Sequence, residues 1–204
     1  MKAVPNAAGT GVYKPGQVRL SSTFVNQGDA AGTAVVGWAV LGDVLYRSDY
    51  ELRIGTGQYQ QQPRLIRIGS GWSSDKLVEE MNYLVQEHGQ TLRTSAYGLR
   101  NDGTLFRWQV NGLTWRRTGS ASGFAAVKTM ALISKTRTYD TFLANTRGGA
   151  LYTVRIPTTA PMRPVVKPVR TKTWQVFESL LAVKCGVSGT LLLGIDKDTK
   201  AGYL

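Results

Sequence analysis

The sequence is poor in the residues that catalysis and metal binding most often use. Its 204 residues contain one cysteine, Cys185, and one histidine, His88. A single cysteine excludes a disulfide framework within the chain and a zinc site built from several cysteines. A single histidine excludes a multi-histidine metal site within one chain. Any Ser-His-Asp chemistry would therefore depend on His88 alone.

Long apolar runs are also absent. No run reaches about 18 apolar residues, so no segment is expected to span a bilayer as a helix. The first residues, 1–6, are not followed by the apolar stretch of a signal peptide. We expect a cytoplasmic protein, or an extracellular one if a leader was removed.

Acidic residues are few, and basic residues never form a block. The 25 basic and 13 acidic residues give a net charge of +12. A positive balance of this size favours attraction to anionic partners. The basic residues are scattered along the chain, which is not typical of a nucleic-acid-binding tail. Apolar residues make up 42% of the chain, and this fraction excludes a disordered protein.

An aromatic residue recurs after small or polar residues at a nearly constant spacing. These aromatic anchors are Phe24, Trp72, Phe124 and Phe177, and their spacings are 48, 52 and 53 residues. The interval from Phe177 through the chain end and back to Phe24 is 51 residues. Four units of about 51 residues therefore use the whole sequence, and a period of this length is typical of repeat architectures.

A second landmark recurs in the same order as the anchors. In each unit an apolar run, a turn rich in Asp or Gly and a second apolar stretch follow one another, which predicts a β-hairpin. The hairpins comprise Val35–Val40 with Leu45–Tyr46, Ala96–Leu99 with Leu105–Phe106, Thr141–Ala144 with Leu151–Tyr152, and Leu191–Ile195 with Tyr203–Leu204. The alternative is coincidence, because glycine and aromatic residues are common in any all-β chain. Two series that agree in order argue against it.

Tandem four-stranded units of this length favour a β-propeller. Because neighbouring blades must cover each other's apolar faces, we expect closure into one domain. The sequence predicts an all-β fold, a β-propeller with four blades of about 51 residues. The predicted domain is 1–204, with blades at about 24–72, 73–124, 125–177, and 178–204 together with 1–23.

The last predicted blade is composite. Its first two strands are expected at Leu191–Asp196 and Ala201–Leu204, and its outer two at Gly11–Tyr13 and Gln17–Leu20. N-terminal and C-terminal strands would then pair and close the ring. The alternatives are a piece of a larger propeller and closure through a second chain.

Three segments have a less regular pattern. Asp75–Val85 carries apolar residues at i, i+1, i+4, i+7 and i+8, which fits either a short helix in a loop or an irregular strand. Four prolines between 157 and 168 predict an extended, strand-poor connection. Cys185, which follows the apolar run Leu180–Val183, is expected to be a small buried hydrophobe.

Four phrases of the sequence form a further set of motifs: Arg67–Trp72, Tyr97–Trp108, Leu113–Ser120 and Gly194–Asp198. These motifs resemble those of the tachylectin-like propellers, a lectin family of invertebrates and their bacterial relatives. Arg67–Trp72 resembles that family's inter-blade signature, and Tyr97–Trp108 resembles the hairpin between its inner strands. Leu113–Ser120 resembles the segment that leads to the next signature, and Gly194–Asp198 has a further, weaker resemblance to the family's motifs. The resemblance implies a lectin-like role in carbohydrate binding.

A sugar site needs a flat aromatic face and nearby amide or carboxamide groups. The candidate ligand-binding residues are Gly69, Ser70, Gly71, Trp72, Asn101, Asp102, Trp108 and Trp115. Glycine allows backbone amides to approach a ligand closely. The alternative for Trp72 and Trp115 is a place in the core between blades. The alternative for Asp102 is a turn residue.

Catalytic patterns are missing from the sequence. Neither a nucleophile elbow nor a phosphate-binding loop is present. The closest acidic pairs are Glu79 with Glu80 and Asp196 with Asp198, and neither suggests an acid–base pair. We expect no enzyme, no metal and no cofactor, but a non-enzymatic carbohydrate-binding propeller whose partner is a glycan. The alternative is a scaffold that binds an acidic protein, nucleic acid or anionic polysaccharide through its basic surface. The oligomeric state stays open.

Overall fold

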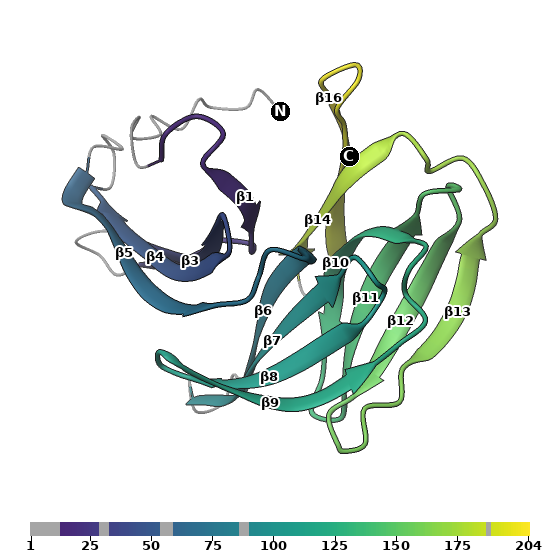
Figure 1. The fold of residues 1–204 in the computed structure, drawn as a ribbon, viewed down its shortest axis with the longest axis horizontal. Helices are drawn as coiled ribbons and strands as arrows, with labels where there is room; N and C mark the ends of the chain where they lie inside the picture. Colours follow the sequence, from purple (N-terminus) through teal and green to yellow (C-terminus); the bar gives the residue numbers. More distant parts are fainter. Residues whose placement is uncertain (1–12, 29–32, 54–58, 86–89, 187–188) are drawn as a thin grey trace. The chain divides into compact units, whose positions relative to one another are not determined.

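A computed structural model describes residues 13–28, 33–53, 59–85, 90–186 and 189–204 (Figure 1). These residues contain no helix, and hence none that could cross a membrane. Their strands form four antiparallel sheets that follow one another along the chain. The predicted all-β fold class, a β-propeller with four blades, is confirmed in the number, order and strand topology of these sheets.

Contacts divide the chain into two compact units, residues 1–74 and 75–204. Each unit is described by itself below. That residues 1–204 form one domain stays a prediction.

The first unit holds one sheet, the first blade. Its strands are β1 (Val18–Ser21), β2 (Val25–Gly28), β3 (Thr33–Leu41), β4 (Val44–Leu52) and β5 (Tyr59–Ser70). β1 and β2 pair with opposite ends of β3, so together they act as one interrupted first strand. At the interruption the Ser22 N–H donates to the Trp38 carbonyl at 2.9 Å, and the Ser22 hydroxyl accepts the Trp38 N–H at 2.9 Å.

The pairing of β1 corrects the predicted composite blade. Residues Gln17–Leu20 were expected beside the C-terminal strands, but Val18 and Leu20 pair with Leu41 and Val40 of β3. A local partner closes a shorter loop, and each doubling of loop length costs about 0.6 kcal/mol. The prediction is therefore wrong for Val18–Leu20. Gly11 and Val12 lie outside the described residues.

The second unit holds three sheets, one for each further blade. The second blade has β6 (Asp75–Val85), β7 (Gln90–Arg100), β8 (Leu105–Asn111) and β9 (Thr114–Ala121). The third has β10 (Val127–Lys135), β11 (Tyr139–Thr146), β12 (Leu151–Pro157) and β13 (Val165–Arg170). The fourth has β14 (Phe177–Cys185), β15 (Gly189–Asp196) and β16 (Ala201–Tyr203). β10 contacts both β6 and β14, so the first strands of the three blades are neighbours.

The predicted hairpins are confirmed in all four sheets, and the open question about residues 75–85 is settled. β6 pairs with β7 along its whole length, so the helical interpretation is wrong. The register shifts between Asp75 and Leu77 and again between Tyr83 and Leu84. A bulge moves the following side chains to the other face of a strand, so two bulges remove the simple alternation that identifies a strand.

In each of the first three sheets, a hydrogen bond joins the turn between the second and third strands to the aromatic anchor that follows the last strand. The anchor N–H donates to a carbonyl in that turn. The pairs are Trp72 with Asp43 at 3.1 Å, Phe124 with Gly103 at 3.0 Å, and Trp174 with Gly149 at 3.1 Å. We call these contacts the anchor hydrogen bonds.

The anchor hydrogen bonds change one member of the predicted series. Trp174, not Phe177, occupies the place of Phe124, because Phe177 donates to the Trp174 carbonyl at 3.2 Å as Val127 donates to that of Phe124 at 3.0 Å. Phe177 is instead the first residue of β14, and its ring covers Gly194. Glycine precedes the other two anchors of this series, Trp72 and Phe124, whereas Thr173 precedes Trp174.

The residue before each of these anchors has a left-handed backbone. The φ angles are 98° at Gly71, 101° at Gly123 and 88° at Thr173. Glycine adopts this region readily, whereas a β-branched residue is strained there. The glycine of the Ser-Gly-Trp phrase is therefore required by the backbone conformation before Trp72.

The main core of the second unit fills the space between its first two sheets. Its largest fully buried rings are Tyr97 and Phe142, which pack edge to face with centroids 5.0 Å apart. A smaller cluster, which includes Leu143 and Leu180, lies between the third and fourth blades. Cys185 does not join it. It is exposed at the end of β14, so the prediction of a buried cysteine is wrong.

Candidate ligand-binding site

Four of the predicted site residues lie in the first unit. Gly69 and Ser70 end β5, Gly71 is exposed, and Trp72 is buried with 8% of its surface exposed. The Asp43 carboxylate accepts the Gly71 N–H at 2.9 Å and the Ser73 N–H at 2.8 Å. These bonds, the Gly71 bond most of all, hold the pKa of Asp43 below its usual value. The Gly71 amide thus donates to Asp43, and the Trp72 ring is buried within the fold.

The other four lie in the second unit, in two separate places. Asn101 and Asp102 are exposed in the turn before β8, where Asp102 accepts the Thr104 N–H at 2.8 Å. This bond lowers the pKa of Asp102 and is typical of an Asp in a turn.

Trp108 and Trp115 are brought together on the β8–β9 hairpin. Both are half-buried, and their ring centroids are 5.7 Å apart with a tilt of 54°. Trp115 lies opposite Val110, towards the end of β8 that is remote from Asn101 and Asp102. The structure therefore joins the two tryptophans with each other, but not with the turn. A role for these residues in sugar binding stays a prediction.

A groove that the predicted residues do not include lies on one face of the β10–β13 sheet. Its volume is about 400 Å³. It is lined by Ser134, Thr136, Tyr139, Thr141, Thr153, Arg155, Val165 and Lys167. The strand register explains this composition, because Ser134, Thr141, Arg155 and Val165 lie directly opposite one another in a row across the four strands.

Two lining residues on neighbouring strands form a cation–π contact. The Arg155 guanidinium carbon lies 3.9 Å from the centroid of the Tyr139 ring. Contacts of this kind contribute about 0.5–1 kcal/mol at exposed sites. Arg155 is exposed, and this contact holds its guanidinium against the Tyr139 ring. Thr153 of β12 lies opposite Lys167 of β13, and the Thr153 hydroxyl donates to the Lys167 carbonyl at 3.5 Å.

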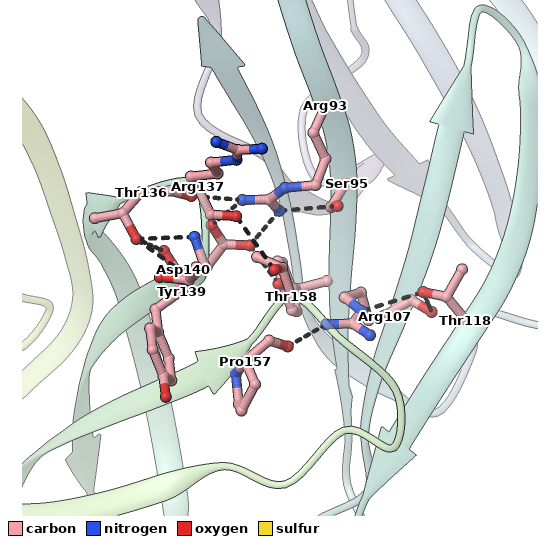
Figure 2. Close-up of polar contacts among 12 residues, drawn as sticks. Arg93, Ser95, Arg107, Thr118, Thr136, Arg137, Tyr139, Asp140, Pro157 and Thr158 are labelled. Carbon is pink, nitrogen blue, oxygen red and sulfur yellow. Dashed lines mark hydrogen bonds and ion pairs between the residues drawn. The ribbon is translucent and has the colours of Figure 1, made fainter.

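An ion pair between Arg93 of the second blade and the buried Asp140 of the third supports the turn that carries Tyr139 (Figure 2). Asp140 is fully buried, and its two carboxylate oxygens accept Arg93 guanidinium N–H groups at 2.7 and 2.8 Å. The Tyr97 hydroxyl donates to the same carboxylate at 2.6 Å. Arg93 also donates to the Thr136 carbonyl at 3.1 Å, so one side chain holds both ends of the β10–β11 turn.

The turn is held from its own sheet as well. The Thr136 N–H donates to the Tyr139 carbonyl at 2.8 Å, and the Thr158 N–H donates to the Thr138 carbonyl at 2.9 Å. The Thr158 hydroxyl donates to the Arg137 carbonyl at 3.2 Å (Figure 2). Because backbone and side chains fix the turn, Thr136 and Tyr139 are positioned before any ligand arrives.

A second buried guanidinium fixes the chain beyond the groove. Arg107 is 4% exposed and donates to the carbonyls of Pro157 at 2.5 Å and Thr159 at 3.2 Å. Its Nε donates to the Thr118 hydroxyl at 3.1 Å. These bonds join the second blade to the segment that leads from β12 to β13. The proline-rich connection is predicted to be strand-poor, and residues 158–164 carry no strand. The prediction is wrong for 165–168, because Pro168 lies in β13 opposite Tyr152; β13 is an edge strand, where proline is tolerated.

The groove carries positive charge without acidic side chains. Its lining includes Arg155 and Lys167 but neither Asp nor Glu. The neighbouring acid, Asp140, has its carboxylate fully buried and paired with Arg93. The local potential therefore favours an anionic or hydrogen-bonding ligand.

No protein-family model matches the chain, and no curated protein matches it in sequence. Within the part of the chain that the structure describes, no three His, Cys, Asp or Glu side chains gather as metal ligands would. His88 lies outside the described residues. The geometry of the groove therefore carries the functional argument.

The sequence contains a signal for the groove that is separate from the aromatic anchors. Tyr139 and Thr141 alternate along one strand, and Thr153 and Arg155 alternate along the next. Residues two apart on a strand share a face, so each pair projects to one side of the sheet. The pairing of those two faces depends on the register, which the sequence alone does not provide.

Proposed function

We propose that the chain is a non-enzymatic carbohydrate-binding β-propeller that holds its glycan in the groove on β10–β13. The observation that carries this proposal is the presence of three Ser and Thr side chains, Ser134, Thr141 and Thr153, beside Tyr139 in one groove, where the hydroxyl of a fourth, Thr136, is bonded within the β10–β11 turn. A hydroxyl both donates and accepts hydrogen bonds, as the hydroxyl groups of a sugar require. A volume of about 400 Å³ lies within the range of small-ligand sites.

The pre-formed turn supports the same proposal. Arg93, Asp140 and Thr158 hold the β10–β11 turn in place without any ligand. A ligand that binds a fixed site loses less free energy to ordering the protein. The resemblance of Arg67–Trp72 and Tyr97–Trp108 to tachylectin-like lectins also favours sugar binding, although those residues lie outside the groove.

A glycan array read at low and high salt tests the proposal. We expect binding to particular glycans that persists in part at high salt, because neutral hydrogen bonds respond little to screening. Thr141→Val removes one groove hydroxyl with little change in shape and is expected to weaken the binding of the best glycan about 5- to 10-fold. Thr171→Val, at an exposed position outside the groove, is the matched control.

Two results would contradict this function. One is that no glycan on the array binds the protein. The other is binding to every polyanion, lost completely at high salt and unchanged in Thr141→Val. The latter would favour the scaffold that binds acidic partners through the basic surface as a whole.

A further inference from the structure

We infer that the groove recognises an acidic substituent of its sugar, so that the ligand class is a saccharide bearing a carboxylate, sulfate or phosphate ester. Arg155 and Lys167 hold the anionic oxygens, and the hydroxyl side chains hold the ring. This inference rests on the proposed function and assigns the chemical class of its ligand.

The first argument is the spacing of the two cations. Arg155 lies opposite Val165, and Lys167 lies two residues further along the same strand. Arg155 and Lys167 therefore occupy diagonal positions on one face of neighbouring strands, about 7–8 Å apart at their Cα atoms. Because both side chains line the same groove, one anionic group of a ligand can contact both cations.

The second argument is that these cations are not neutralised by acids. Elsewhere, Arg64 pairs with Asp49 at 3.0 Å and Lys128 with Glu178 at 2.6 Å. Among the described residues, no carboxylate lies within ion-pair distance of Arg155 or Lys167. The groove thus has two cations available to an anionic ligand.

The third argument is the orientation of Arg155. Its guanidinium lies against the Tyr139 ring, and a guanidinium in this position has its N–H groups at its edge. A guanidinium edge can bind a planar carboxylate or two oxygens of a sulfate through parallel hydrogen bonds. Thr141 lies directly opposite Arg155, so a sugar hydroxyl next to the acidic group would meet a hydroxyl partner.

Isothermal titration with matched ligands tests the inference. The probes are a monosaccharide found on the glycan array, its uronate or sulfate-ester form, and inorganic sulfate. We expect the acidic sugar to bind at least 10-fold more tightly than the neutral sugar, and more tightly than sulfate alone. Arg155→Gln and Lys167→Gln are each expected to weaken the acidic sugar about 10-fold and to reduce the ratio between its affinity and that of the neutral sugar.

Arg170→Gln is the control, because Arg170 is exposed on the same strand outside the groove lining and its loss changes the net charge equally. Equal affinity for neutral and acidic sugars would overturn the acidic class while leaving carbohydrate binding intact. Equal weakening by Arg170→Gln would overturn it as well, because general surface charge would then explain the binding. Equal binding of sulfate and the acidic sugar would reduce the site to an anion site and overturn it too. Failure of every glycan to bind would instead overturn the proposed function itself.

Discussion

At the scale of single residues, Asp140 supports the candidate site although it does not line the groove. Its carboxylate is fully buried and accepts three hydrogen bonds, two from Arg93 and one from Tyr97. Burial, followed by the charge of Asp140, raises the pKa of the Tyr97 hydroxyl far above its usual value of 10.0. Tyr97 therefore stays protonated and continues to donate.

Asp140→Asn is expected to lower the free energy of unfolding by about 3 kcal/mol. The substitution leaves the Arg93 guanidinium, four-fifths buried, without its charge partner. Removing one partner of a buried pair costs about 3–5 kcal/mol. Urea denaturation measures the change.

Arg64→Gln provides the control for Asp140→Asn, because it breaks the Arg64–Asp49 pair at a side chain that is 63% exposed, while Asp49 keeps its contact with Arg47. We expect a loss of less than about 1 kcal/mol there. Equal losses in the two variants would mean that burial does not govern the Arg93–Asp140 pair.

At the scale of elements, the strands follow from the sequence wherever alternation is unbroken. β8 illustrates this, because Leu105 and Arg107 are buried while Phe106 and Trp108 are less so. β6 shows the limit, since its two bulges leave a pattern that also fits a helix. The sequence does not encode bulge positions in residue type alone, because a bulge depends on the partner strand.

Thr173→Gly is expected to stabilise the protein by about 1 kcal/mol. A β-branched residue with a φ of 88° is strained by about 1–3 kcal/mol, and glycine relieves that strain. The added freedom of glycine in the unfolded chain offsets about 0.4–1 kcal/mol of the gain. Thermal unfolding measures the net effect as a higher melting temperature.

The control for this position is Thr171→Gly, two residues earlier. Thr171 is exposed and is not among the described residues with positive φ, so glycine offers no relief there. We expect that variant to melt at a lower temperature than the parent. A decrease in both variants would show that the backbone before Trp174 is not strained.

At the scale of the whole molecule, the number of blades could be predicted, but the strand that begins the first one could not. The period of about 51 residues and the hairpin turns give four sheets in the right order. The pairing of Val18 with Leu41 depends on a competition between partners, and only the loop length could have favoured the nearer one. The groove could not be predicted for a related reason. Thr141, Arg155 and Val165 become neighbours only through the register of three strands, and the sequence alone does not provide that register.

Three blades each have an Asp carboxylate at a turn, and these carboxylates predict how the stability of the molecule depends on pH. Asp43, Asp102 and Asp196 accept backbone N–H groups near their turns, with the Asp196 carboxylate also bonded to the Thr199 side chain. Each pKa in the folded state is lower than the usual value of 3.8. A carboxylate with a lowered folded pKa stabilises the fold fully above its unfolded pKa, and this contribution is lost as the pH falls through the folded pKa.

We therefore expect the melting temperature to be nearly level down to about pH 5 and to fall steeply below about pH 4. The matched variant replaces Asp43, Asp102 and Asp196 together with Asn, which keeps the hydrogen-bond acceptor but removes the titration. It should be less stable at pH 6, and its melting temperature should fall less between pH 4 and pH 2. The growing positive charge of the chain destabilises both proteins in acid, so only the difference between them reports on the three turns. Parallel curves for the two proteins would assign the acid sensitivity to net charge and contradict a role for the turn carboxylates.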